Sequence, residues 1–153
     1  MEATRILPDL QCSLVCEDLR QEVTGNLILI GVLDAIRVPQ VPVVAMRLLV
    51  FTRWTAGVGQ FVQTVRLLAP DQATVVGKQE LRFAMQDPYL NASNVAVLQQ
   101  VEFKAAGIYF VEVLVDNVLK VRYPLHVVQV QAPGQQAPPA PAQAPTGGTS
   151  TSA

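Results

Sequence analysis

The chain has 153 residues, of which half are hydrophobic and only 15% are charged, and its formal net charge is −1. Because about a quarter of the residues of a typical soluble domain are charged, we expect apolar side chains on the surface and association with another chain. The near-neutral charge excludes the basic field that nucleic-acid binding requires. No stretch reaches the roughly 20 apolar residues of a membrane-spanning helix.

The amino-terminal segment shows no basic region followed by an apolar one, so the sequence predicts a cytoplasmic protein without a secretory signal. Two cysteines, Cys12 and Cys16, flank Leu14 in the first apolar segment. In a strand, these three side chains share one face and the two Cα atoms lie about 13 Å apart, too far for a disulfide. We therefore expect both cysteines to be reduced, buried and resistant to thiol reagents.

Alternation of apolar and polar residues, interrupted by Gly, Pro, Asn and Asp turns, predicts seven or eight strands. Within residues 44–54, Met46 and Trp54 share the expected core face, whereas Arg47 and Arg53 share the solvent face. The two-residue turn Asp116-Asn117 predicts a hairpin near the end of the pattern. This spacing is typical of an all-β, antiparallel, immunoglobulin-like β-sandwich. The predicted strands are residues 10–16, 26–33, 44–54, 60–68, 74–83, 96–103, 108–115 and 118–130.

Two segments depart from the strand pattern. Residues 84–94 form a long connection, which we expect either to cross between the sheets or to bind a ligand, with one helical turn begun by Asp87 and Pro88. After residue 131 the composition changes to Pro, Ala, Gln, Gly, Ser and Thr. The sequence therefore predicts a β-sandwich domain over residues 1–131 and a disordered tail over residues 132–153.

The remaining chemistry offers little for catalysis. The only histidine, His126, lies on the closing strand, where we expect a structural hydrogen bond rather than a general base. Glu17, Asp18 and Glu22 lack calcium-loop spacing, so we expect a charged rim of the first hairpin. The sequence predicts no metal, no cofactor and no enzymatic activity.

Three arginines have two possible arrangements. Arg47, Arg53 and Arg66 either belong to a solvated sheet face, which we favour, or form a positive patch if the third and fourth strands pair with each other.

The segments 16–22, 25–34 and 107–113, together with Asp116 and the pair Pro124-Leu125, resemble a family of small bacterial proteins of unknown function built as immunoglobulin-like sandwiches. The resemblance covers about residues 8–128. It implies a bacterial origin and a sandwich fold, and it supplies no activity and no catalytic residues.

These observations favour a noncatalytic module that binds a protein partner or forms a homo-oligomer. We expect the contact to involve the hairpin 108–128, treated as an exposed edge, with Leu114 on its outer side. The alternative is a small-ligand or carbohydrate-binding module that uses the aromatic planes of Trp54 and Tyr89. A third hypothesis, a hydrolase using Glu17, Asp18 or Asp34, has no spacing that supports it.

Overall fold

The structure, a computed structural model, describes residues 4–130, and every regular element in that part of the chain is a β-strand. The predicted tail, residues 132–153, lies outside the described residues. The nine strands are β1 (Asp9–Gln21), β2 (Leu27–Val32), β3 (Ala35–Val38), β4 (Val43–Thr55), β5 (Gly59–Leu68), β6 (Val75–Met85), β7 (Ala92–Phe103), β8 (Gly107–Val115) and β9 (Val118–Gln129).

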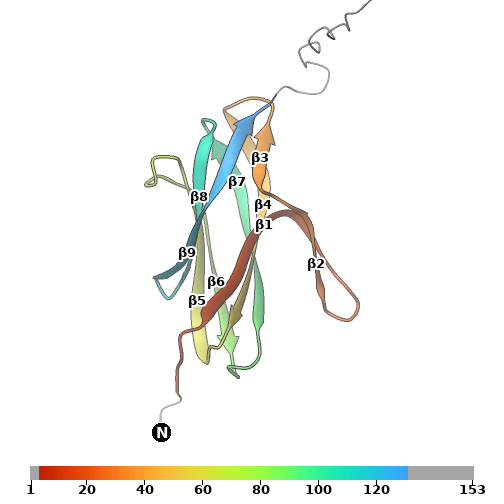
Figure 1. Cartoon of the computed structure of the whole chain (residues 1–153), viewed down its shortest axis with the longest axis vertical. Helices are drawn as coiled ribbons and strands as arrows, with labels where there is room; N and C mark the ends of the chain where they lie inside the picture. Colours follow the sequence, from red (N-terminus) through yellow and green to blue (C-terminus); the bar gives the residue numbers. More distant parts are fainter. Residues whose placement is uncertain (1–3, 131–153) are drawn as a thin grey trace, which may run out of the picture.

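The strands form two sheets that face each other (Figure 1). Sheet I has the order β2-β1-β4-β7, and sheet II has the order β3-β9-β8-β5-β6. Neighbouring strands are antiparallel, except that β3 runs parallel to β9. The expectation of an all-β sandwich is thus confirmed at the level of two packed sheets.

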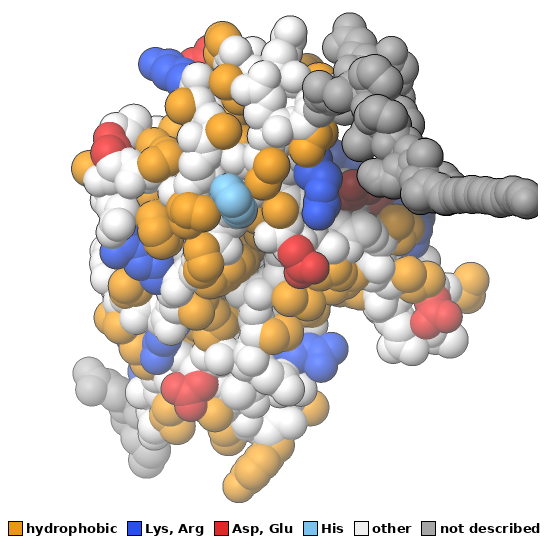
Figure 2. All heavy atoms as spheres, turned by 45° about the horizontal axis from the view of Figure 1, so that its top comes forward, with side chains coloured by type: hydrophobic (Ala, Val, Ile, Leu, Met, Phe, Trp, Pro, Cys, Tyr) orange, Lys and Arg blue, Asp and Glu red, His pale blue; other side chains and the backbone are white. Residues whose placement is uncertain are grey.

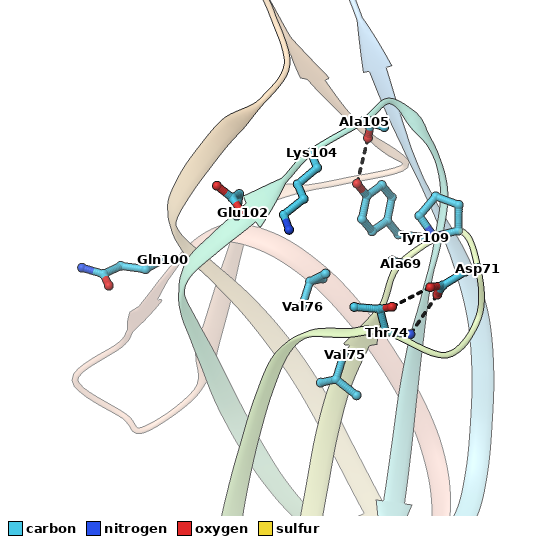
Figure 3. Close-up of a pocket in the computed structure, with 11 residues that line it drawn as sticks. Ala69, Asp71, Thr74, Val75, Val76, Gln100, Glu102, Lys104, Ala105 and Tyr109 are labelled. Carbon is cyan, nitrogen blue, oxygen red and sulfur yellow. Dashed lines mark hydrogen bonds between the residues drawn. The ribbon is translucent and has the colours of Figure 1, made fainter.

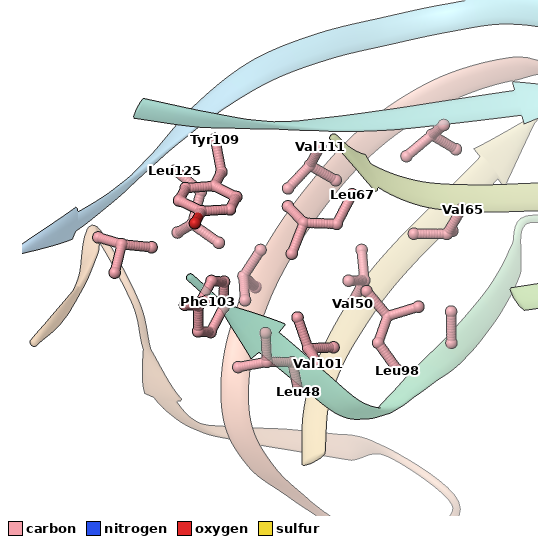
Figure 4. Close-up of a cluster of buried hydrophobic side chains, with 14 of the residues drawn as sticks. Leu48, Val50, Val65, Leu67, Leu98, Val101, Phe103, Tyr109, Val111 and Leu125 are labelled. Atoms are coloured by element: carbon pink, nitrogen blue, oxygen red, sulfur yellow. The ribbon is translucent and has the colours of Figure 1, made fainter. Parts of the chain in front are cut away.

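The core lies between the sheets and consists of aliphatic and aromatic side chains from both of them (Figure 4). Phe103 of sheet I packs edge-on against Tyr109 of sheet II, with ring centroids 5.0 Å apart. Burying one large aliphatic or aromatic side chain contributes about 1.5–3 kcal/mol, so this layer is the main source of stability. Its fully buried aliphatic members include Val50, Val65, Leu67, Val101, Val111 and Leu125.

One strand was not predicted, and β3 brings the number among the described residues to nine rather than seven or eight. It has four residues, and Pro39 follows directly. The prolines of residues 38–42 indicate a turn, so the sequence pattern does not reveal a strand of only four residues directly before it. Its pairing with β9 and the burial of Val38 define it as a strand.

The alternation of core-facing and outward-facing residues in β4 is interrupted near the beginning of the strand. Ala45 and Leu48 both pack in the core, so the two residues between them, Met46 and Arg47, both point outward. The opposing strand β7 makes the same change, with Gln100 at a φ of 54°. Met46 is 67% exposed, so the prediction that it shares the core face is wrong.

The turns are located where the sequence predicts them. Asp116 and Asn117 have φ values of 47° and 67°, as the two-residue hairpin turn requires. The connection from β6 to β7 crosses from sheet II to sheet I, which confirms the crossover interpretation. Instead of a helical turn it has a hydrogen-bonded turn, in which the Tyr89 amide donates to the Asp87 carboxylate at 2.8 Å.

Candidate functional site

Trp54, expected to offer a flat surface to a sugar, has no exposed surface at all. Its Nε1 donates to Oε1 of Gln63 at 2.7 Å, and the Thr52 hydroxyl donates to the same oxygen at 2.6 Å. Gln63 is itself fully buried, and its Nε2 has no hydrogen-bond partner among the described residues. Trp54 therefore belongs to a polar cluster in the core, and a ligand cannot stack on it in this conformation.

The other two predicted interaction residues lie on different elements of the fold. Tyr89 is 91% exposed on the β6–β7 connection, so a binding role for it stays a prediction. Leu114 is only 8% exposed on β8, where it pairs with Thr64 and Leu119 of the flanking strands. The structure brings none of the three predicted residues together into one site.

The hairpin 108–128 is a sheet edge only in part. Its strands are β8 and β9, and β8 lies between β9 and β5, whereas β9 lies between β3 and β8. β8 has hydrogen-bonded neighbours on both sides, so the prediction of an open edge is wrong for β8 and Leu114; β3 pairs with β9 only at residues 126–129, so residues 118–125 of β9 remain open on that side among the described residues. Sequence alone did not reveal the strands that cover them, because those pairings join residues far apart in the chain.

The three predicted arginines are divided between the sheets. Arg47 and Arg53 lie on β4 of sheet I, and Arg66 lies on β5 of sheet II, so the alternative of a positive patch, which required these strands to pair, is wrong. Arg66 instead donates from Nε to the carboxylate of Glu112 at 2.6 Å.

Glu112 is the centre of a charged group on the outer face of sheet II. It is only 5% exposed because Arg66 and Arg122 cover it, the second with Nε 3.4 Å from the carboxylate. The Arg122 guanidinium also lies over the Phe110 ring, 4.9 Å from its centroid. This arrangement joins β5, β8 and β9 by charge-assisted contacts.

The only histidine lies on the same outer face. Figure 2 shows it in pale blue among hydrophobic side chains. His126 pairs with Ile108 on one side and Ala35 on the other. It is exposed on the closing strand, as expected, and the structural hydrogen bond expected of it stays a prediction.

The cysteines differ from each other. The core-facing residue of this part of β1 is Val15, and Leu14 is 39% exposed, because a register shift occurs between Leu10 and Cys12. Cys16 is fully buried on the side away from the core, and Cys12 is half-buried. Burial, and secondarily the nearby Asp18 carboxylate, raises the pKa of the Cys16 thiol.

The acidic cluster lies mostly within a strand rather than in a turn. Glu17 and Asp18 belong to β1, which continues to Gln21. The Leu19 amide and the Arg20 guanidinium donate to the Asp18 carboxylate and, with Arg47 nearby, lower its pKa. Among residues 4–130, no group of three or more His, Cys, Asp or Glu is placed to hold a metal ion.

A two-stranded arm, which we define as residues 17–32, leaves sheet I at Cys16. β1 pairs with β4 up to Cys16, and from Cys16 onward it pairs with β2 alone. Figure 1 shows the β2 end of this arm projecting beside the body of the sandwich. Sequence reasoning treated this region as an ordinary first hairpin and missed that it separates from the sheet.

The two sides of the arm have different environments. On the inner side, Leu27 and Leu29 line a cleft of about 610 Å³ together with Cys12, Phe51 and Arg53 of sheet I. Away from the cleft, the exposed fractions of Ile28 and Ile30 are 44% and 39%, and Val32, which follows Gly31, is 49% exposed. Three neighbouring β-branched side chains thus remain in solvent on a strand that ends its sheet.

A separate pocket of about 570 Å³ lies at the end of the sandwich, between the β5–β6 turn and the end of β7 (Figure 3). Its wall includes Val75, Val76 and Tyr109, and the Tyr109 hydroxyl donates to the Ala105 carbonyl at 2.7 Å. Hydrogen bonds from the Thr74 hydroxyl and from the Thr74 and Ala73 amides lower the pKa of Asp71. Glu102 and Lys104 are the other charged residues of the pocket.

The comparisons with known proteins give a family and no activity. Residues 11–128 match the model of a family of unknown function, DUF6941, and the chain belongs to that family. No curated protein matches the sequence. In the part of the chain that the structure describes, no helix is long and apolar enough to cross a membrane.

Proposed function

We propose that this member of a family of unknown function is a noncatalytic protein-binding module that acts through the open edge of β2. The observation that carries the proposal is the arm, in which six consecutive residues, Leu27–Val32, contain neither charge nor proline and end a sheet. Such an edge offers unpaired backbone N–H and C=O groups to an added strand.

The end strands of the sheets other than β2 are protected among the described residues, and the part of β9 that β3 does not cover, residues 118–125, carries Lys120, Arg122 and Pro124. The β7 edge lies beside β6, where the Val97 amide donates to the side-chain oxygen of Gln79. β6 carries exposed Lys78, Glu80 and Arg82, and β3 is short and ends before Pro39. Charged residues, prolines and short strands are the usual means of blocking strand addition. β2 has no charged residue and no proline, although it is only six residues long.

The proposal includes an immunoglobulin-like fold. The strand order β1-β4-β7 facing β9-β8-β5-β6 supports it, because the same neighbours occur as A-B-E and G-F-C-C′ in immunoglobulin domains. β2 and β3 would then be an insertion between the first two strands of that fold. A bacterial, cytoplasmic protein is part of the same proposal, and the two unpaired cysteines support a reducing compartment.

The experiment is cross-linking affinity purification of the full chain from its native host, with the variant Ile30→Lys beside the wild type. We expect a stoichiometric protein, either another chain or a second copy, to be cross-linked to the wild type and lost with Ile30→Lys. The matched control is Val118→Lys, because Val118 is 45% exposed on a strand of sheet II. Equal recovery with all three proteins, or none with the wild type, would refute the proposal.

A small-ligand module is the second candidate, and the pocket of Figure 3 is the observation that favours it. Apolar walls with a few convergent polar groups are typical of ligand sites. A thermal-shift screen with small carboxylates, amines and sugars tests it. A hit that Lys104→Ala or Glu102→Ala abolishes would support this function, and the absence of any hit would leave protein binding as the better explanation.

A further inference from the structure

We infer that the cleft between the arm and sheet I binds a small organic acid, which places its apolar body between Leu29 and Phe51 and its carboxylate on Arg53. The ligand class is a monocarboxylate with a hydrocarbon chain. The cleft is separate from the pocket of Figure 3 and from the free edge of β2, so this inference goes beyond the proposed function and does not depend on it.

The cleft has apolar side chains on both the arm and the sheet. Phe51 lies on the outer face of sheet I, because Val50 and Thr52 beside it face the layer between the sheets. It is nevertheless only 6% exposed. From the arm, Leu27 and Leu29 line the same cleft, and being two residues apart on a strand they project on one side. A hydrocarbon chain between these groups leaves water for an apolar environment.

The cleft has one positive charge and no carboxylate among the described residues that line it, and the positive charge belongs to Arg53. Within residues 4–130, Arg53 forms no ion pair, and its side-chain hydrogen bond is a long one from Nε to the Ser93 hydroxyl at 3.5 Å. Arg47 of the same strand differs, because the Asp18 carboxylate lies 3.2 Å from it. The Arg53 guanidinium therefore keeps its terminal N–H groups for a ligand.

The neighbours of Arg53 suit a carboxylate. The register places Cys12 and Ser93 on either side of Arg53, in one row across β1, β4 and β7. A guanidinium donates parallel hydrogen bonds to a carboxylate, and the Ser93 hydroxyl, which accepts from Arg53, is free to donate another. The Cys12 thiol lies beside the same position, so its reactivity reports whether the cleft is occupied.

Charge and volume select the class of acid. One cation balances one negative charge, so a monocarboxylate is favoured over a phosphate monoester or a dicarboxylate, which would bring an uncompensated charge between apolar side chains. An amine is disfavoured because its ammonium would meet the guanidinium without a carboxylate between them. The cleft of about 610 Å³ is within the range of about 300–1,000 Å³ typical of small-molecule sites. It therefore has room for a chain much longer than that of acetate.

The first test measures the rate at which Cys12 of the full chain reacts with iodoacetamide, a neutral reagent. Octanoate, at concentrations up to ~5 mM that detect millimolar affinities, should slow this reaction saturably. At saturation we expect a decrease of at least about 5-fold, because the filled cleft blocks access to the thiol. Octanol lacks the charge, acetate lacks the chain and octylamine has the opposite charge, so none of these should protect Cys12 as octanoate does.

The second test changes the guanidinium. Arg53→Gln should weaken octanoate binding about 10- to 100-fold, the equivalent of one hydrogen-bonded contact with a charged group, and should remove the preference for octanoate over octanol. The matched control is Arg37→Gln, because Arg37 is exposed on β3 of sheet II, away from the cleft. This variant should bind octanoate like the wild type. Circular dichroism checks that both are folded, and if Arg53→Gln is not, the comparison of ligands in the wild type is decisive.

Three results would overturn the inference: no protection of Cys12 by octanoate, equal protection by octanol, or unchanged octanoate affinity in folded Arg53→Gln. Protection accompanied by faster labelling of Cys16 would also count against it, because octanoate would then be loosening the fold instead of filling the cleft. Neither test involves a protein partner. A partner recovered from the native host without octanoate binding leaves the proposed function standing alone, and octanoate binding without a partner leaves this inference standing alone.

Discussion

The outer face of sheet II and the arm of sheet I are both β-surfaces in contact with solvent, yet one carries charged side chains and the other aliphatic ones. Sheet II carries alternating charges along β6, its edge strand, and a carboxylate between two arginines in its middle. The arm has only aliphatic residues and one glycine along its edge strand β2. The difference shows which edge is protected and which is available.

Symmetric pairing makes the contrast sharper. If β6 paired with its own copy about Glu80, that carboxylate would face itself and Lys78 would face Arg82. Like charges directly opposite each other are destabilising, so β6 is protected against self-association. β2 carries no charged residue that would oppose an added strand in this way.

The largest expected effect comes from removing that protection. The triple variant Lys78→Val, Glu80→Val, Arg82→Val should convert β6 into a second apolar edge and produce large, concentration-dependent aggregates, because each chain would then have two association surfaces. Dynamic light scattering measures this. The charge-conserving control Lys78→Arg, Arg82→Lys should remain as dispersed as the wild type, and a dispersed triple variant would show that β6 charges are not protective.

Next in size is the effect of Glu112→Ala on stability. Two guanidinium groups would lose their shared acceptor, and since hydrogen bonds to charged groups contribute about 1.5–3 kcal/mol, we expect a loss of about 2 kcal/mol. Urea denaturation measures it. The matched control is Glu80→Ala, because Glu80 is 59% exposed and 3.6 Å from Lys78, and an exposed pair contributes less than about 1 kcal/mol. Equal losses would mean that the central carboxylate has no special role.

Thiol labelling measures how firmly the arm is held on sheet I. Cys12 lines the cleft under the arm and is half-buried, whereas Cys16 is fully buried and its pKa is raised. We expect Cys12 to be labelled in the native protein and Cys16 at least about 100-fold more slowly, since its reaction needs local opening. Peptide mapping by mass spectrometry follows both residues. Similar rates would indicate that the arm opens freely.

The smallest effect is a pH dependence at the root of the arm. The pKa of Asp18 is lowered in the folded protein, so its contribution to stability is present above the unfolded value of about 3.9 and is lost as the pH falls through the lower folded value. Amide exchange of β2, corrected for intrinsic rates, should therefore accelerate below about pH 4. Asp18→Asn should abolish this dependence, and an unchanged profile would exclude Asp18 as its cause.

Local patterns predicted much of the fold. The turn Asp116-Asn117 and the alternation around it predicted the β8–β9 hairpin, because turn geometry depends on adjacent residues. The pattern did not predict which strands lie beside that hairpin, since β5 and β3 reach it from distant parts of the chain. The enclosed position of β8 and of Leu114 has this cause.

The candidate site was less predictable still. A register shift after Leu10 reversed the expected faces of β1, and the departure of the arm at Cys16 left no local signal. The apolar run Leu27–Val32 was visible as a strand, but whether its free side faces solvent or another strand depends on the complete sheet order. The alternation of apolar and polar residues in β4 correctly predicted that Trp54 faces the core. A side chain buried in the core cannot also bind a ligand at the surface, so the two predictions for Trp54 were incompatible.

The burial of Trp54 gives the protein an internal reporter. It is the only tryptophan in the sequence, it is fully enclosed and it is hydrogen-bonded to Gln63. Its fluorescence therefore records the integrity of the layer between the sheets, and it is insensitive to events on the outer side of the arm. If the arm opens while the tryptophan emission stays unchanged, the arm is a cooperative unit that unfolds separately from the core. The same fluorescence measurement then distinguishes local opening of the arm from global unfolding.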